Sequence, residues 1–225
     1  MSDSLSLDEL NKRIMKHKHD IIKAVLKKLQ LIESTSIGLD YKIIWNAMQS
    51  LAIETIAEIL KTEFKKAKFN VPESKSTYPD LEMRYNKFTI AIDIKSNEAQ
   101  KDPWYDIARL DTILAKRIYK FDEEYDIIIK YDKKSKKVIN VYFELLRDTV
   151  GKTKDGGIKY RPYDGKLRPK NWKDFENEIT YWHNKEKFIQ EIKRTQIQRW
   201  KRYIITIMIP VLADNEKVEF KKLFC

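Results

Sequence analysis

The run "FTIAIDIK", residues 88–95, constrains the fold of this chain more than any other stretch. Its apolar side chains recur at every second position, which is the period of a β-strand, so we expect a strand over 87–95 beside a shorter one at 81–84. Asp93 and Lys95 interrupt the run. Charged side chains are rarely placed in an apolar strand unless they have a partner, an ion or a chemical role.

The rest of the chain is predicted to form helices before and after a sheet. Apolar residues at helical spacing predict helices over 7–30 and about 40–66, and a third from Pro103 to about 118. This order predicts an α/β (α+β) protein with a central mixed β-sheet flanked by helices, and the length suits a single domain over 1–225. The remaining predicted elements are strands at 125–132 and 137–146, a helix at about 172–200 and a buried strand at 203–213.

Charge and cysteine content narrow the class of protein. The chain has 45 Lys and Arg residues against 34 Asp and Glu, a formal charge of +11. This excess favours a polyanionic partner such as nucleic acid, although a lysine-rich protein without such a partner fits equally well. Cys225 is the single cysteine, the start "MSDSLSLDEL" lacks a secretory signal, and the apolar run 203–213 is too short to span a bilayer. We therefore expect a cytoplasmic protein with no membrane contact.

Asp80 completes a group of charges around the opening run. It follows Pro79 where a turn leads into the first strand, whereas Asp93 lies on the second strand. If "RYNK" (84–87) is the turn of a hairpin, the two carboxylates stand side by side. A divalent cation would relieve their repulsion, and hard oxygen ligands favour Mg²⁺ over zinc. Lys95 follows Asp93 by two residues and therefore points to the same face of the strand.

This arrangement suits phosphodiester hydrolysis, with Asp80, Asp93 and Lys95 as the catalytic residues. The metal would hold the scissile phosphate and acidify a bound water. Lys95 would orient or help deprotonate that water and offset charge on the pentavalent transition state. The competing interpretation is a salt bridge between Lys95 and one aspartate at the sheet surface. Pro-Asp, a short gap and Asp-x-Lys on one β-rich run together favour the catalytic site.

The pattern resembles the PD-(D/E)xK nuclease superfamily, in which Pro-Asp precedes an acidic-x-Lys strand. Here the matching residues are Pro79-Asp80 and Asp93-Ile94-Lys95. The resemblance is closer to type II restriction endonucleases of the EcoRV type, and it implies a restriction-endonuclease-like fold. It is carried by "YPD", "IAIDIK", "IYKFDEEYDIII" (118–129), "GKTKDGGI" (151–158) and "YWHN" (181–184), which occur in the same order.

The resemblance implies roles at the matching positions. Asp80 and Asp93 would be the metal ligands, with the Ile94 backbone carbonyl as a further ligand. Ser96 and Asn97 would lie beside the scissile phosphate.

The family also has a glutamate on the preceding helix that assists the metal site. The corresponding position in this chain is Asn46, which departs from the family pattern. Glu54 and Glu58 lie nearby on the same predicted helix, and helical spacing does not decide whether either points inward.

The segment 150–171 holds four of the five glycines of the chain and much positive charge. Glycines permit close approach of the backbone, and the neighbouring polar groups supply donors and acceptors of the kind that read base edges. Its match to the family's recognition loop favours base readout over a flexible surface loop. The candidate DNA-binding residues there are Lys152, Thr153, Lys154, Asp155, Gly156 and Gly157.

Two further sets of residues are candidates for contacts with the DNA backbone. Ser76 and Thr77, in "PESKST", correspond by position to a minor-groove loop of the family, although an ordinary turn fits equally well. Phosphate neutralisation would come from scattered cations, each of which is individually more typical of a solvated surface. These cations are Lys116, Arg117, Lys159, Arg161, Lys166, Arg168 and Lys170.

We therefore expect a Mg²⁺-dependent type II restriction endonuclease that cleaves double-stranded DNA at a specific site and leaves 5′-phosphates and blunt ends. A palindromic site predicts a homodimer, with the N-terminal helical part contributing to dimerisation. A companion DNA methyltransferase would protect the host genome. The alternatives are a structure-selective or repair nuclease with the same catalytic core, and a non-catalytic DNA-binding protein.

Overall fold

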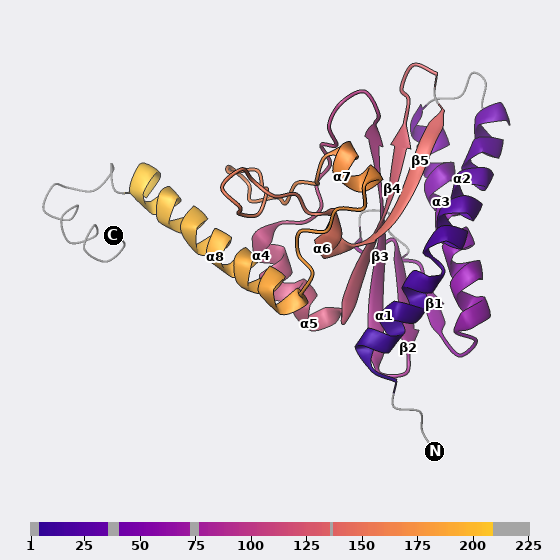
Figure 1. Cartoon of the computed structure of the whole chain (residues 1–225), viewed down its shortest axis with the longest axis horizontal. Coiled ribbons are helices and arrows are strands. Elements are labelled where there is room, and N and C mark those ends of the chain that lie inside the picture. The colour runs from indigo at the N-terminus through magenta and orange to yellow at the C-terminus, as the bar shows by residue number, and fades with distance from the viewer. Residues whose placement is uncertain (1–4, 36–40, 73–76, 136, 209–225) are drawn as a thin grey trace, which may run out of the picture.

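A five-stranded sheet in the order β1-β2-β3-β4-β5 forms the centre of the protein (Figure 1). The computed structural model describes residues 5–35, 41–72, 77–135 and 137–208. Because β3 and β4 are parallel while all other neighbours are antiparallel, the sheet is mixed, as the sequence predicts. The strands are β1 (Lys68–Asn70), β2 (Leu81–Tyr85), β3 (Phe88–Glu98), β4 (Glu123–Tyr131) and β5 (Val138–Leu145).

Three N-terminal helices cover one face of the sheet. They are α1 (Leu7–Lys16), α2 (Lys18–Thr35) and α3 (Tyr41–Glu63), and their buried apolar side chains join Ile92, Ile94 and Ile127 in one hydrophobic cluster. Ser6 caps α1 in a capping box with Glu9, so the first helix has a defined start.

The opposite face of the sheet is covered by the crossover between β3 and β4 and by the C-terminal part of the chain. Ile128 and Tyr142 project into this second hydrophobic cluster, together with residues of the segment 150–171. The elements on this side are α4 (Leu110–Thr112), the π-helical turn η1 (Ile113–Arg117), α5 (Ile118–Lys120), α6 (Leu146–Thr149), α7 (Trp172–Glu176), α8 (Lys185–Tyr203) and the π-helical turn η2 (Ile204–Met208). The α/β (α+β) prediction is thus confirmed, with helices on both faces of a mixed sheet (Figure 1).

Several predicted element boundaries are wrong. The helix expected at 7–30 breaks at His17 and then continues to Thr35. Pro103 opens no helix, because the residues after it run irregularly until Leu110. The helix expected at 172–200 is two helices, and Glu178 between them adopts a φ of 52° that no α-helix accommodates.

The predicted buried strand at 203–213 is also wrong where the structure describes it. Tyr203 ends α8, and Ile204–Met208 continue as a helical turn. Tyr203 is 56% exposed and Ile205 is 39% exposed, so this apolar run does not enter the core. The remainder of the run, 209–213, lies outside the described residues. Within the described part of the chain, no helix has the length and apolar character needed to cross a membrane.

Candidate active site

Asp80 is held at the start of β2 by hydrogen bonds from two other elements. It follows the cis Tyr78–Pro79 peptide bond, and Pro79 is buried. The backbone N–H of Ile94 on β3 donates to Asp80 Oδ2 at 2.7 Å, and Gln49 Nε2 on α3 donates to Asp80 Oδ1 at 2.6 Å. Both oxygens of Asp80 therefore have fixed directions, and the carboxylate faces β3.

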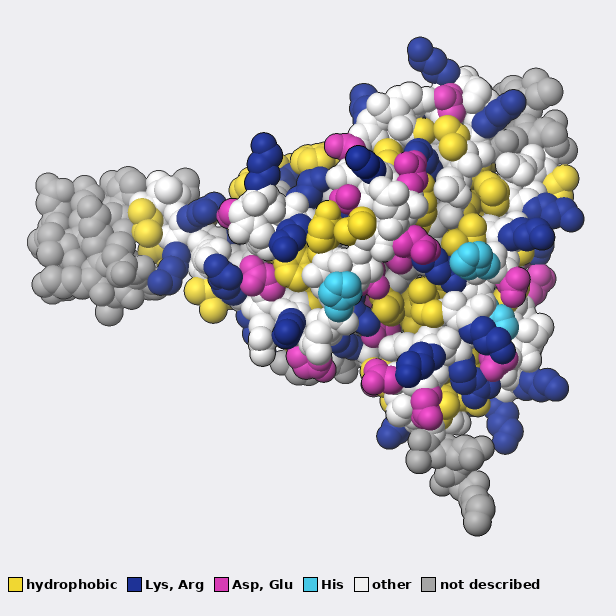
Figure 2. Space-filling view, in the orientation of Figure 1, with side chains coloured by type: hydrophobic (Ala, Val, Ile, Leu, Met, Phe, Trp, Pro, Cys, Tyr) yellow, Lys and Arg dark blue, Asp and Glu magenta, His cyan; other side chains and the backbone are white. Residues whose placement is uncertain are grey.

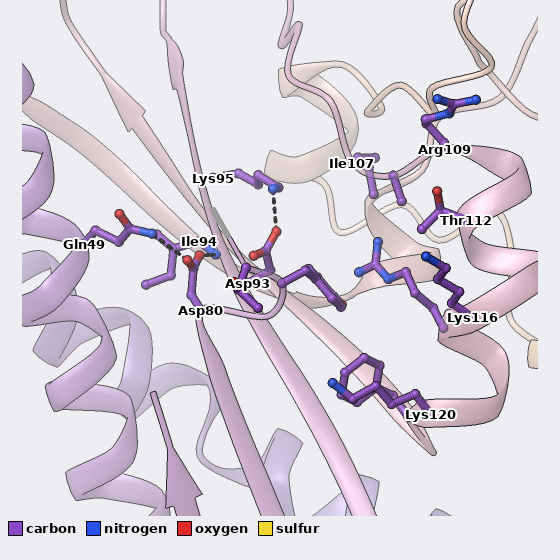
Figure 3. Close-up of a pocket in the computed structure, with 15 residues that line it drawn as sticks. Gln49, Asp80, Asp93, Ile94, Lys95, Ile107, Arg109, Thr112, Lys116 and Lys120 are labelled. Atoms are coloured by element: carbon purple, nitrogen blue, oxygen red, sulfur yellow. Dashed lines mark hydrogen bonds and ion pairs between the residues drawn. The ribbon is translucent and has the colours of Figure 1, made fainter. Parts of the chain in front are cut away.

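Asp93 and Lys95 meet Asp80 from the neighbouring strand. Asp93 is 5% exposed, and Lys95 Nζ forms an ion pair with Asp93 Oδ2. Figure 3 shows the carboxylate of Asp80 next to that of Asp93, with the amine of Lys95 directed toward Asp93. The two-residue spacing thus places the Asp93 and Lys95 side chains on one face of β3. The predicted catalytic residues are together in the structure.

Burial and neighbouring charges shift the pKa values of Asp80 and Lys95. Burial, reinforced by the negative charge of Asp93, raises the pKa of Asp80 to about 7. Burial opposes the charge on Lys95, but Asp93 and Asp126 outweigh this effect and raise the pKa of its ammonium group. Lys95 is therefore a cation at neutral pH. With a pKa of about 7, Asp80 would be half protonated near neutral pH, because burial and the adjacent charge of Asp93 disfavour its ionised form.

The donor set fits a hard divalent cation. Asp80 and Asp93 offer carboxylate oxygens, and Ile94 lines the same pocket. Among the described residues, no group of three or more His, Cys, Asp or Glu side chains could surround an ion. A cation here would have only two acidic ligands, and water or substrate would complete its shell, which is the manner in which proteins usually hold Mg²⁺.

Gln49 is the α3 side chain that reaches this site, and the sequence did not identify it. Glu54 and Glu58 are exposed, and Glu58 pairs with Lys28 at 2.9 Å, so neither joins the carboxylates. Gln49 follows Asn46 by three residues, which is the spacing of one helical face. That spacing is the one sequence signal that could have identified Gln49, although a neutral amide side chain does not by itself indicate a metal site.

A pocket of about 510 Å³ opens over the carboxylates. Asp80, Asp93 and Lys95 line its wall, and Arg109, Lys116 and Lys120 line it from the crossover between β3 and β4 (Figure 3). We call these three exposed cations the cationic rim. Arg109 pairs with Asp111 at 2.6 Å and Lys120 lies 3.7 Å from Glu82, so carboxylates offset part of the charge of the rim.

Arg117 was expected to neutralise phosphate, and the structure corrects this. Its guanidinium forms an ion pair with Glu124 at 2.6 Å and lies 3.4 Å from the ring centroid of Tyr78. The Tyr78 hydroxyl donates to the same Glu124 carboxylate. Arg117 is 6% exposed, so its main role is to anchor the residues before Asp80 to β4 at the wall of the site.

Asp126 is a second functional candidate that the sequence did not identify. It pairs with Asp93 in the parallel register of β3 and β4, and it is fully buried. Thr149 Oγ1 donates to Asp126 Oδ2 at 3.0 Å, while Asp126 Oδ1 has no hydrogen-bond partner. Burial, reinforced by Asp93, raises the pKa of Asp126 to about 7. A third carboxyl group therefore lies behind the site.

The residues expected to flank the scissile phosphate have other contacts. Asn97 Oδ1 accepts the backbone N–H of Trp104 at 3.0 Å and so fixes the start of the crossover. Ser96 alternates with Lys95 along β3 and projects from the opposite face. Thr77 lines the pocket beside Tyr78, whereas Ser76 lies outside the described residues.

The segment 150–171 is folded and is not a flexible loop. Isolated bridges pair Val150 with Pro169, Lys152 with Ile158, and Tyr160 with Leu167. At its tip, the turn Thr153–Gly157 is closed by a hydrogen bond from Thr153 N–H to the Gly157 carbonyl at 2.8 Å, and Gly156 has a φ of 93°. This turn leaves Lys152, Lys154 and Asp155 exposed, while Thr153, Gly156 and Gly157 shape it.

The other cations expected to neutralise phosphate mostly have hydrogen-bond or ion-pair partners within the protein. Arg168 is 1% exposed and pairs with Asp106 at 2.6 Å, and Lys166 reaches the same aspartate at 2.5 Å. Arg161 binds Asp164, whose pKa this contact lowers well below the ordinary value. Lys159 donates to the Pro169 carbonyl and Lys170, 1% exposed, to the Ile179 carbonyl. Of that predicted set, Lys116 and Arg117 line the pocket, and Lys116 is the exposed one of the two.

Comparison with known proteins gives structural similarity only. No family model matches the chain, and no curated protein matches it. Among solved structures, it is similar to NlaIV restriction endonuclease, with a TM-score of 0.44 and 19% identity, over 67% of this chain and 65% of that one. It is also similar to Hjc, a Holliday junction resolvase from Archaeoglobus fulgidus, with a TM-score of 0.32 and 12% identity, over 55% of this chain and 95% of that one. The aligned region thus spans just under two thirds of the NlaIV chain. At these similarities, the argument for function rests on the site itself.

Proposed function

We propose that this protein is a Mg²⁺-dependent type II restriction endonuclease that hydrolyses phosphodiester bonds in double-stranded DNA. The observation that carries the proposal is the meeting of Asp80, Asp93 and Lys95 in one pocket lined by the cationic rim. Two adjacent carboxylates can hold a divalent cation that assists phosphodiester hydrolysis, and a neighbouring ammonium group can offset charge in its transition state. The rim supplies the positive charge that a phosphate backbone would meet on entering.

The residues of the site have separate roles in this reaction. Asp80 and Asp93, with the Ile94 carbonyl, would hold Mg²⁺, which when bound supplies Lewis acidity at the scissile phosphate. Gln49 orients the Asp80 carboxylate through its hydrogen bond. Lys95, kept charged by Asp93 and Asp126, orients the attacking water and offsets negative charge in the transition state. Its raised pKa makes it a poor base, so it acts as a cation.

Sequence specificity would come from the exposed tip of the segment 150–171. Lys152, Lys154 and Asp155 present donors and acceptors beside a turn fixed by its glycines. The EcoRV-type resemblance of the sequence supports cleavage at the centre of a palindromic site, leaving blunt ends with 5′-phosphates. A homodimer, a single domain over 1–225 and a companion DNA methyltransferase belong to the same proposal. The N-terminal helices would contribute to the dimer contact.

Digestion of a plasmid in the presence and absence of Mg²⁺ tests the function. A type II enzyme gives discrete bands that require Mg²⁺, and sequencing of the ends reports the site and the cleavage offset. A smear or preferential cutting of branched DNA would instead indicate the structure-selective or repair nuclease. Binding without cleavage under any divalent cation would indicate a DNA-binding protein, and the proposal would then be wrong.

A further inference from the structure

The end of α8 forms a basic arm beside the segment 150–171. Between Glu191 and Met208 the chain carries no acidic residue. Figure 1 shows α8 extending away from the sheet, and Figure 2 shows Lys and Arg side chains along this extension. The cations of the arm are Lys193, Arg194, Arg199, Lys201 and Arg202.

Arg199 fixes the segment to this arm. Its Nε donates to the Pro162 carbonyl at 3.0 Å, and its Nη2 donates to the Tyr163 carbonyl at 3.1 Å. Gly165 has a φ of 71°, and a Cβ there would lie 3.2 Å from Arg199 Cζ. Glycine is thus needed at this position both for its dihedral angle and for the close approach of the guanidinium. The arm and the segment therefore form one unit.

A groove of about 660 Å³ runs between the turn Thr153–Gly157 and the side chains of α8. Gln198, Lys201 and Arg202 line it from the helix, and all three are exposed. Asp155 faces them, and its pKa is lowered first by its hydrogen bond from Thr153 and also by the charge of Arg202. We call this space the arm groove.

Acidic side chains only partly offset the charge of the arm groove. Glu191 pairs with Arg194 at 3.4 Å, and Asp155 is the other carboxylate in its lining. Lys201 and Arg202 therefore leave an excess of positive charge, unlike Arg161, Lys166 and Arg168, which have aspartate partners. Trp200 and Tyr203 stand beside them and are 53% and 56% exposed. Exposed basic side chains fit the negatively charged backbone of a nucleic acid.

We propose that the arm groove binds the phosphate backbone of double-stranded DNA outside the base pairs read by the turn Thr153–Gly157. This inference rests on the proposed function and extends the DNA-contacting surface beyond the active-site pocket. The exposed apolar residues of the arm could also suggest a second copy of the chain. Two arms bearing the same charge would repel each other, however, so the charge favours a polyanion.

A matched pair of double variants tests the arm groove. Lys201→Gln with Arg202→Gln removes two charges from the groove, and Lys65→Gln with Lys66→Gln removes two exposed charges just after α3. Binding of each protein to a labelled duplex of roughly three helical turns is measured by fluorescence anisotropy at several salt concentrations without Mg²⁺. Each lost phosphate contact should lower the slope of log K against log salt by about 0.9.

The groove variant should bind about tenfold more weakly than wild type near 0.1 M salt, with a slope smaller by about 1.8, while the control variant matches wild type. Equal slopes for the two variants would overturn the inference. If the groove variant keeps wild-type DNA affinity but sediments as a monomer where wild type sediments as a dimer, the inference is overturned and the arm contacts a second copy of the chain.

If wild type cuts plasmid with Mg²⁺ but the groove variant binds DNA as wild type does, only the proposal for the arm groove fails. If wild type binds DNA without cutting it, the nuclease proposal fails. The slopes of log K against log salt for the two variants would then still show whether the arm groove binds DNA. Absence of DNA binding by wild type would overturn both proposals.

Discussion

The pKa values of aspartates are shifted in opposite directions at the active-site pocket and in the segment 150–171. In the pocket, burial and mutual repulsion raise the pKa of Asp80 and of Asp126 to about 7. In the segment, the hydrogen bond from Arg161 lowers the pKa of Asp164 well below its ordinary value. Asp106 likewise takes Arg168 and Lys166 as partners.

This difference shows in which region the charged groups find their partners within the protein and in which region a bound ligand would stabilise them. In and beside the segment, Arg161, Lys166 and Arg168 are paired with Asp164 or Asp106, so these ionic contacts define a structure. Around Lys95, the carboxyl groups of Asp80, Asp93 and Asp126 lie close to one another and are largely buried, so an added cation would stabilise them. Charge in the sequence alone does not make this distinction, because both regions are rich in ionisable residues. The following predictions test it, beginning with the largest effect.

Asp93→Asn should abolish cleavage, with a loss of at least about a thousandfold, because the ion would lose a carboxylate ligand. Single-turnover cleavage of a plasmid at saturating protein measures the effect, and anisotropy without metal should show DNA binding close to wild type. Glu54→Gln, an exposed carboxylate on α3, is the control and should cleave normally. Cleavage by Asp93→Asn at the wild-type rate would show that the site lies elsewhere.

Lys95→Met should slow the chemical step by roughly a hundredfold or more while changing DNA affinity less than about threefold. The side chain acts on charge that develops during the reaction, so its loss affects the transition state more than the bound DNA. Rapid-quench single-turnover rates and equilibrium binding together measure this split. An equal loss in both quantities would make Lys95 a DNA-binding residue only.

Asp126→Asn should stabilise the metal-free protein at pH 8, on the order of 2 kcal/mol. A carboxyl whose folded pKa is raised to about 7 destabilises the fold as pH rises from about 4 to 7, because the unfolded chain releases its proton first. The asparagine variant has no such proton, so its advantage should fade near pH 4. Thermal melts at a series of pH values follow this trend, and a constant difference would refute the assignment.

Gln49→Leu should raise the Mg²⁺ concentration needed for half-maximal cleavage by about tenfold. The Asp80 carboxylate would lose a hydrogen bond of 2.6 Å and rotate more freely. Metal titrations of cleavage rate compare this variant with Ala47→Leu, an exposed position on the same helix. If the metal requirement rises equally in both variants, the effect belongs to the helix and not to the amide.

Asp164→Asn should have the smallest effect and the opposite pH dependence. Its depressed folded pKa contributes stability above about pH 4, which is lost as pH falls through the folded value. The variant should therefore melt slightly below wild type at pH 7 and equal it at low pH, with an unchanged cleavage rate constant. A large fall in that rate constant would show that the segment shapes the chemistry as well as recognition.

The sequence predicted the centre of the site because its signals are local. The two-residue period of the run 88–95 predicts β3, and Asp93 and Lys95 then share a face on geometric grounds alone. The hairpin turn, which was predicted over 84–87 and is confined to Asn86 and Lys87, brings Asp80 beside them, so the catalytic residues needed no distant contact.

The sequence failed where burial depends on distant partners. Arg117 and Arg168 look like surface cations until Glu124 and Asp106 are seen beside them. The helix expected from Pro103 begins only at Leu110, because the residues between them form the crossover that packs against the segment. Gln49 has no charge that would mark it as part of the site. The run 203–213 has the composition of a core strand, and the exposure of Tyr203 and Ile205 at its start shows that composition alone does not determine burial.

Calorimetric titration of Mn²⁺ into the wild-type protein and Asp80→Asn tests the central claim most directly. Near pH 7, wild type should bind the ion and release a proton, because Asp80 has a pKa of about 7 and must ionise to serve as a ligand. The variant should show neither the proton release nor the wild-type affinity. Equal binding by both proteins, with no dependence of the heat on the ionisation enthalpy of the buffer, would contradict a shared cation at Asp80 and Asp93.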